Sequence, residues 1–292
     1  MARKRKRKPE SDGGSYQRGG GYNTKKARSP GKGGATSAMA ASAAAAVESG
    51  AVMGKDLSSA NQIGPSASVV KLTDGTKEKH EPRLIIVLEK ANLETIKTQR
   101  GMELLNCDDH LKLHKKYKKD PKDSRPDILH QCLLTLLDSP LNKAGLLKVY
   151  VRSNKNVLID VAPTIRLPRT FKRFAGLMVQ LLHKLKIRSA SSSSALLKVI
   201  QSSSLQQRLP SEAQKYSTAV TGKLVDAYDF VKTLPKDKPT VFVFGAMAHG
   251  VIDDVASSYC DAGSISLSKY PLSGAYALSR LLNAYEHHLG VV

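Results

Sequence analysis

An arginine and an aspartate two residues apart, Arg125 and Asp127, are the first residues whose types and spacing could move a proton. A carboxylate can accept or orient a proton, and a neighbouring guanidinium can balance the charge that develops. Pro126 lies between them and is typical of the first turn of a helix, where Asp127 would also favour the helix dipole. From these residues alone, a catalytic pair and an ordinary helix start both remain open.

Three arginines follow in the segment IRLPRTFKR: Arg166, Arg169 and Arg173. We expect Arg169 and Arg173 to share a helix face because they are four residues apart, with Arg166 just before the helix. Guanidinium groups gathered at one helix start suit several phosphates or a folded RNA strand. The alternative is a basic face that only keeps the protein soluble.

Glycines flank the turn GAMAHG, from Gly245 to Gly250, directly after the apolar run 241–244. Glycines at the carboxyl end of a buried parallel strand let a ligand approach the backbone. The pattern is neither GxGxxG nor a Walker loop, so neither a dinucleotide nor a nucleoside triphosphate is indicated. The other interpretation is a tight exit from the strand.

A second loop leads into the last predicted helix. Backbone N–H groups at such a helix start can bind a polar ligand, although the same sequence can form an ordinary cap. The loop consists of Leu267, Ser268, Lys269, Tyr270, Pro271 and Leu272.

The elements that must position these residues follow from the apolar patterning. Strands are predicted over 83–89, 146–151, 156–161, 196–200, 241–244 and 264–267, and helices over 127–138, 169–187, 224–233 and 272–289. We expect a short helix or loop over 89–97, a basic connector over 111–125, and Ser-rich and polar loop over 188–215 around its one strand. Strands that alternate with helices indicate an α/β fold with a mostly parallel sheet.

The chain of 292 residues carries 46 Lys and Arg against 25 Asp and Glu, a net charge of +21. Residues 1–34 contribute +9 of this charge, so residues 35–292 are basic in their own right. Such a charge favours a polyanion partner, most simply nucleic acid or a ribonucleoprotein.

Residues 1–80 form a basic tail rich in Gly, Arg and Ala that is predicted to be disordered, and residues 82–292 form the folded domain. The run Arg3–Lys8 would serve as a nuclear address and a phosphate contact, or would simply be a solvated charge run.

Composition also excludes several classes of protein. No apolar run approaches the length of a membrane span, so no membrane association is expected. The three cysteines are too few and too scattered for a disulfide framework or a zinc site, which favours a reducing, intracellular compartment and no metal.

Taken together and in order, five segments resemble one family. The segments are SRPDILHQCLL, VLIDVAPTIRLPRTFKRFAGLMVQLLHKL, LLKVI, VFVFGAMAHG and LSKYPLS. They are similar to the nucleolar pseudouridine-N1 methyltransferases of small-subunit ribosomal RNA, which belong to the SPOUT, or α/β-knot, class. The resemblance implies a mostly parallel sheet with a C-terminal trefoil knot, a rare exception to the unknotted chain, and a homodimer. It also implies a place in the nucleus and nucleolus, in contact with pre-ribosomal proteins.

The resemblance further implies that the knot forms a pocket for S-adenosylmethionine. Gly245, Gly250 and the backbone of residues 267–272 would line this pocket, with a further contact near Thr218. The RNA would meet five side chains: Arg125, Asp127, Arg166, Arg169 and Arg173.

For such a reaction, the imide-like N1–H of pseudouridine must lose its proton before the nitrogen attacks the sulfonium methyl. Asp127 would orient or accept this proton while Arg125 balances the charge on the base. No catalytic cysteine is required. The main alternative is a non-catalytic RNA-binding factor for ribosome assembly on the same fold, and a further one is a SPOUT enzyme that acts on tRNA or another position.

Overall fold

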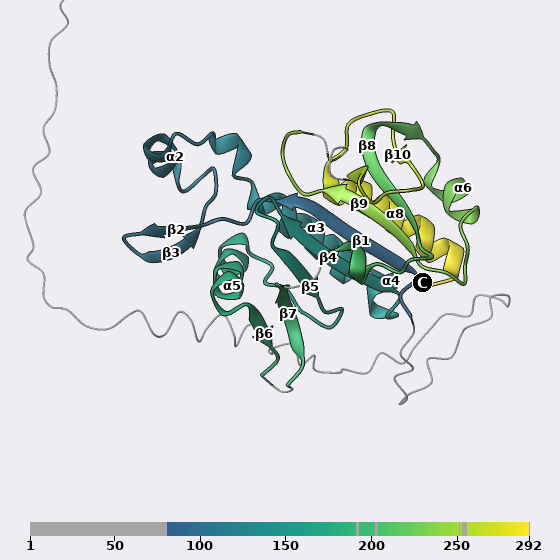
Figure 1. Cartoon of the computed structure of the whole chain (residues 1–292), viewed down its shortest axis with the longest axis horizontal. Coiled ribbons are helices and arrows are strands. Elements are labelled where there is room, and N and C mark those ends of the chain that lie inside the picture. The colour runs from purple at the N-terminus through teal and green to yellow at the C-terminus, as the bar shows by residue number, and fades with distance from the viewer. Residues whose placement is uncertain (1–80, 191–192, 202–203, 251, 253–255, 292) are drawn as a thin grey trace, which may run out of the picture.

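The computed structural model describes residues 81–190, 193–201, 204–250, 252 and 256–291 (Figure 1). The predicted tail over residues 1–80 lies outside the described residues. Within them, no helix is both long and apolar enough to cross a membrane.

One eight-stranded sheet organises the described chain, in the order β10-β8-β9-β1-β4-β5-β7-β6. Its strands are β1 (Leu84–Ala91), β4 (Leu147–Ser153), β5 (Leu158–Val161), β6 (Lys186–Arg188), β7 (Ala195–Ile200), β8 (Gln214–Leu224), β9 (Thr240–Gly245) and β10 (Ser264–Ser266). The five strands from β10 to β4 are parallel, whereas β5, β7 and β6 continue the sheet antiparallel. All six predicted strands are present, and the α/β class with a mostly parallel sheet is confirmed.

The centre of the sheet is buried on both faces because β1 and β9 are continuous apolar runs. On one face, Leu84, Ile86 and Leu88 of β1 pack against helices, which are α3 (Pro126–Asp138), α5 (Phe171–Lys184), α6 (Ala227–Lys232) and α8 (Gly274–Leu289). On the other face, Ile85 and Val87 are covered by non-strand segments at residues 205–213, 252 and 256–259.

The expected basic connector over 111–125 is wrong, because this stretch contains α2 (Leu111–Tyr117) and the short 3₁₀ helix η1 (Pro121–Asp123). A hairpin of β2 (Thr95–Thr98) and β3 (Gly101–Leu104) precedes them. The expected short helix or loop over 89–97 is therefore wrong in part, because β1 continues to Ala91 and β2 begins at Thr95. These elements form a lobe, residues 92–125, that projects from one end of the sheet (Figure 1).

The expected loop up to residue 215 and helix over 224–233 are also wrong in part, because β8 extends from Gln214 to Leu224 and the helix begins only at Ala227. β8 is half-exposed and polar, so it lacks the apolar pattern of a buried strand. Gly222 allows its close contact with β10, since a Cβ there would lie 2.6 Å from the carbonyl carbon of Ile265. A short α4 (Pro140–Lys143) follows α3.

Candidate active site

The two predicted ligand loops meet at a pair of glycines. Gly245 ends β9, and Gly274 opens α8 directly after the second loop. A Cβ at Gly274 would lie 3.6 Å from the carbonyl oxygen of Gly245 and 3.2 Å from Sγ of Cys132 in α3. The structure therefore brings the GAMAHG turn, the 267–272 loop and α3 to one place.

The shape of the GAMAHG turn depends on the absence of side chains at Gly245 and Gly250. A Cβ at Gly245 would lie 3.2 Å from Cγ2 of Ile252, which is tight, and 3.5 Å from Cε of Met247, which is ordinary van der Waals contact. Gly250 has φ +98°, a conformation that side chains other than glycine rarely adopt. Met247 lines the space next to both glycines, a role that the sequence did not reveal. His249 is exposed.

The second loop offers backbone donors. The N–H of Tyr270 donates to Oγ of Ser268 over 3.0 Å, and Oγ of Ser266 donates to the carbonyl of Ser268. In the described part of the chain, no acceptor is found for the backbone N–H groups of Lys269 and Leu272. Leu267 is buried, whereas Lys269, Tyr270 and Pro271 are exposed. The loop can thus present amides to a polar ligand.

Thr218 lies in β8 next to the end of β9. Its hydroxyl donates to the carbonyl of Val243 over 2.8 Å, two residues before Gly245. The side chain thereby ties β8 to the strand that carries the glycine turn, at the edge where the two loops meet.

A buried polar group behind the glycine turn was not predicted. Glu89 follows the apolar run of β1, is 1% exposed, and pairs with Gly245 across the ladder. Its Oε2 accepts from Nε of Arg152 over 2.8 Å, and its Oε1 accepts from the hydroxyl of Tyr259 over 2.5 Å. Burial, together with the Glu89 carboxylate, raises the pKa of Tyr259, so this hydroxyl remains a donor. The network anchors the segment around Tyr259 to the carboxyl ends of β1 and β4.

The predicted pair at the start of α3 is formed. Nε and Nη2 of Arg125 donate to the two carboxylate oxygens of Asp127 over 2.8 and 2.7 Å, a bidentate arrangement. The hydrogen bond to Asp127 raises the pKa of Arg125. Pro126 is the first residue of α3 and Asp127 lies in its first turn, as expected. Both side chains are about a third exposed, at 39% and 30%, so they remain open to a substrate.

Helix α3 connects this pair to both loops. Cys132 in α3 meets the start of α8, and the N–H of Leu141 after α3 donates to Glu286 near the end of α8 over 3.4 Å. The two helices therefore run side by side in the same direction. Asp127 lies before Cys132 in α3, on the side of the 267–272 loop.

The three predicted arginines are all exposed, but their arrangement differs from expectation. α5 begins at Phe171 with Thr170 as an extended N-cap, so Arg169 lies before the helix and shares no helix face with Arg173. Arg169 instead forms a bidentate ion pair with Asp138 at the end of α3. Thr170 has an extended backbone, with φ −91° and ψ 137°, so the helix begins only after it.

The arginine segment is attached to α3 by a histidine. Nε2 of His130 donates to the carbonyl of Pro168 over 2.8 Å, and its ring stacks on Phe174 at 4.4 Å. Burial lowers the pKa of His130, which favours the neutral ring. The ring therefore holds the arginine segment against α3 and does not carry a proton.

The three cysteines are poor nucleophiles. Burial raises the pKa of Cys132 and of Cys260 to about 12, and it also raises the pKa of Cys107. A thiol with a raised pKa is protonated at neutral pH, which argues against a thiolate nucleophile. Among the described residues, no group of three or more His, Cys, Asp or Glu side chains could hold a metal ion.

Comparison with known proteins agrees with this geometry. A family model described as EMG1/NEP1 methyltransferase matches residues 86–286. A Drosophila melanogaster protein named ribosomal RNA small subunit methyltransferase NEP1 is 50% identical over 218 residues, which cover 73% of this chain and 84% of that protein. A Homo sapiens protein of the same name is 48% identical over 210 residues, 72% of this chain and 83% of that protein.

A solved structure shares the fold. The crystal structure of Archaeoglobus fulgidus Nep1 bound to S-adenosylhomocysteine matches with a TM-score of 0.55 and 24% identity, over 71% of this chain and 99% of that chain. Since the family model spans more than half of the residues and two relatives are about half identical, the chain belongs to the EMG1/NEP1 methyltransferase family.

Proposed function

We propose that this chain transfers a methyl group from S-adenosylmethionine to N1 of a pseudouridine in small-subunit ribosomal RNA. One observation supports this most directly. α3 carries the Arg125–Asp127 pair at its start and meets the two glycine loops at Cys132, so an acid–base pair and a backbone-lined loop site adjoin. The curated relatives carry names with the same reaction class and RNA.

The loops fit the proposed cofactor. Gly245 and Gly250 leave space beside Met247. The amides of Lys269 and Leu272, which have no acceptor among the described residues, can donate to its polar groups. When bound there, S-adenosylmethionine supplies an electrophilic methyl on a sulfonium centre. The chain's part is to hold this group in line with the base, which needs positioning rather than covalent chemistry.

Asp127 handles the proton in this mechanism. Each of its oxygens accepts from Arg125 and keeps a further lone pair, which can accept the N1–H of the base. Arg125 holds the carboxylate in place and balances the negative charge as the nitrogen loses its proton. The protonated cysteines are compatible with this mechanism, because attack by N1 needs no thiolate.

The exposed arginines hold the RNA. Arg166, Arg169 and Arg173 would contact phosphates next to the target, which offsets part of the cost of taking the base out of its stack, a few kcal/mol. This basic surface also supports the alternative function, a non-catalytic factor for ribosome assembly, because an RNA-binding protein could serve assembly without turnover.

The test uses two RNA loops of identical sequence, one with pseudouridine and one with uridine at the target. The full chain with S-adenosylmethionine should methylate the pseudouridine loop alone, and nuclease digestion with mass spectrometry should place the methyl on the base. A folded chain that binds both cofactor and RNA but leaves pseudouridine unmodified would support the assembly function instead.

A homodimer is part of the same proposal. Exposed apolar side chains gather on β8, α6, the 267–272 loop and α8, which lie together at one end of the molecule (Figure 1). They are Val220, Leu224, Tyr228, Tyr270 and Tyr276. A second copy would cover them beside the cofactor loop. Light scattering should give twice the chain mass, and Val220→Asp combined with Tyr276→Asp should give the monomer; a monomeric parent protein contradicts this part.

The trefoil knot, the pre-ribosomal partners and the nucleolar location complete the proposal. β10 follows β9 in the chain but lies beyond β8 in the sheet, so the chain after β9 must cross β8, as a knot at this end requires. The basic run Arg3–Lys8 supports nuclear import. Deleting residues 1–34 and imaging a fluorescent fusion tests the location, and a nucleolar signal that survives the deletion would contradict this role of the tail.

A further inference from the structure

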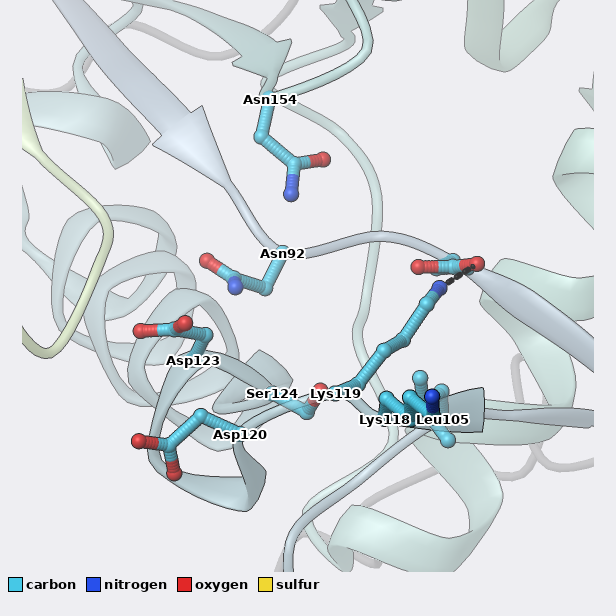
Figure 2. A pocket seen from close by; sticks show the side chains of 9 residues that line it. Asn92, Leu105, Lys118, Lys119, Asp120, Asp123, Ser124 and Asn154 are labelled. Carbon is cyan, nitrogen blue, oxygen red and sulfur yellow. Dashed lines mark hydrogen bonds and ion pairs between the residues drawn. The ribbon is translucent and has the colours of Figure 1, made fainter. Parts of the chain in front are cut away.

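A polar cavity of about 320 Å³ lies between the lobe and the sheet, outside the site described above. Four segments converge on it: the link from β1 to β2 with Asn92 and Glu94, Leu105 after β3, residues 118–124 around η1, and Asn154 at the tip of the β4–β5 hairpin. Its volume suits a small organic group rather than a few waters. Figure 2 shows Asn154 above Asn92, with Asp123 and Asp120 below, on the side to which the Asn92 amide points.

Three of the lining side chains are unused by the fold. Within the described residues, Asn92, Asn154 and Asp123 make no side-chain hydrogen bond. By contrast, the side chain of the buried Asn106 binds Leu104, Asp108 and Asp109. Amides and a carboxylate that the fold does not use, placed around one cavity, are available to a ligand.

The cavity is lined by charged side chains of both signs. Glu94 is paired with both Lys119 and Lys155, and the dashed line in Figure 2 marks its contact with Lys119. Lys118 and Lys119 are exposed on the cavity lining. The lysines favour a ligand that carries phosphate on its outer side, while the free Asp123 carboxylate favours a hydrogen-bond donor within.

The cavity adjoins the proton-handling pair. Ser124 lines the cavity, and its carbonyl accepts from the N–H of Cys107 over 2.9 Å, which fixes this point of the chain. The next residue is Arg125, about 3.8 Å away along the backbone. A group in the cavity is therefore a near neighbour of a base held at Asp127.

We propose that this cavity binds one nucleobase with an exocyclic amino group, from the nucleotide next to the target in the RNA strand. Unpaired RNA bases are recognised by hydrogen bonds on their edges, in which carboxylates accept from the cytosine amino group and asparagine pairs with adenine. Uracil has no exocyclic amine and offers Asp123 only the single N–H of its ring edge. This inference rests on the proposed function for the identity of the ligand, but not for the cavity.

The experiment measures binding of the full chain to pseudouridine-containing RNA loops by fluorescence anisotropy. Each nucleotide flanking the target is replaced in turn by uridine or by an abasic site. At one flanking position, replacement of an amino-bearing base should weaken binding about 5- to 150-fold, the value of one base contact.

Two variants then test whether the base at that position binds in the cavity. Asn154→Ala and Asp123→Ala change exposed side chains that hold nothing in the fold, so both proteins should fold and bind S-adenosylmethionine normally. They should lose the preference for the amino base and bind the uridine loop as the parent does. Asp237→Asn, an exposed carboxylate in the loop before β9, is the control and should keep the preference.

The outcomes separate the two proposals. A preference that survives in both cavity variants, or no flanking preference at all in a chain that methylates pseudouridine, overturns the base site and leaves the proposed function intact. A preference that depends on Asn154 and Asp123 in a chain that methylates nothing supports the base site and contradicts the proposed reaction.

Discussion

Around Gly245 and Gly274 the candidate site is built from backbone, whereas around Asp127 and Arg169 it is built from exposed charged side chains. The first region depends on the absence of side chains and on a buried network behind it. The second depends on particular functional groups at the surface of α3. Substitutions should therefore act in opposite ways: added atoms damage the backbone region, and removed charges damage the side-chain region while the fold persists.

The largest effect on turnover is expected in the side-chain region. Asp127→Asn keeps a similar shape and can still accept one bond from Arg125, but it cannot take up the proton. Single-turnover methyl transfer should fall about 10²- to 10⁴-fold, with binding of cofactor and RNA retained. Asp237→Asn serves as the charge-matched control, and near-normal turnover in Asp127→Asn would remove this residue from the chemistry.

The buried network gives the next largest effect, on the backbone region. Tyr259→Phe keeps the ring over Arg152 but removes a donor from the buried Glu89 carboxylate. The free energy of unfolding should fall by about 1–3 kcal/mol, and cofactor affinity should fall with it, because the segment behind Gly245 loosens. Urea unfolding and calorimetry measure the two quantities. Tyr117→Phe, at an exposed position in α2, should change neither. An unchanged Tyr259→Phe protein would mean that the network holds nothing in place.

A smaller effect concerns the arginines. Arg169→Ala should weaken RNA binding and reduce the slope of log K against log salt by at most about 0.7–0.9, the contribution of one phosphate. Because Asp138 already pairs with Arg169, Asp138→Asn should instead strengthen RNA binding and steepen the slope. Fluorescence anisotropy over a salt series measures both, and a slope that neither substitution changes excludes a phosphate contact by Arg169.

The smallest effect is one of pH on the link between α3 and the arginine segment. Burial lowers the pKa of His130 in the folded chain, whereas the unfolded chain takes up a proton near pH 6.5. The unfolded state therefore binds more protons as the pH falls, so this contribution is complete above pH 6.5 and is lost toward the lower folded pKa. His130→Gln keeps a donor for Pro168 but does not titrate. Between about pH 7.5 and 5.5, the melting temperature of the parent should fall further than that of the variant; parallel curves would contradict this.

The sequence predicted best what depends on local pattern. Continuous apolar runs located β1 and β9, and Pro126 with Asp127 located the start of α3. The polar, half-exposed β8 was missed because a parallel strand inside the sheet edge needs its neighbours to be identified. The lobe was missed because its elements are short and are held by side-chain contacts such as His110 with Glu103.

Contacts between distant segments could not be predicted from pattern. Glu89, Arg152 and Tyr259 come from three segments that only the sheet order brings together. The pairing of Arg169 with Asp138 likewise needs the packing of α5 against α3. The family resemblance, and not spacing, implied that Gly245 and the 267–272 loop line one pocket. The contact of Gly245 with Gly274 was not predicted.

The central claim is that the backbone region holds S-adenosylmethionine, and calorimetry on the full chain tests it most directly. We expect the parent to bind the cofactor with micromolar affinity and Gly245→Val to lose detectable binding, because even a Cβ at this position would press on Ile252. Gly176→Val, on the open face of α5, is the matched control and should bind as the parent does. Equal cofactor binding by the folded Gly245→Val protein, or no binding by the parent, would contradict the account.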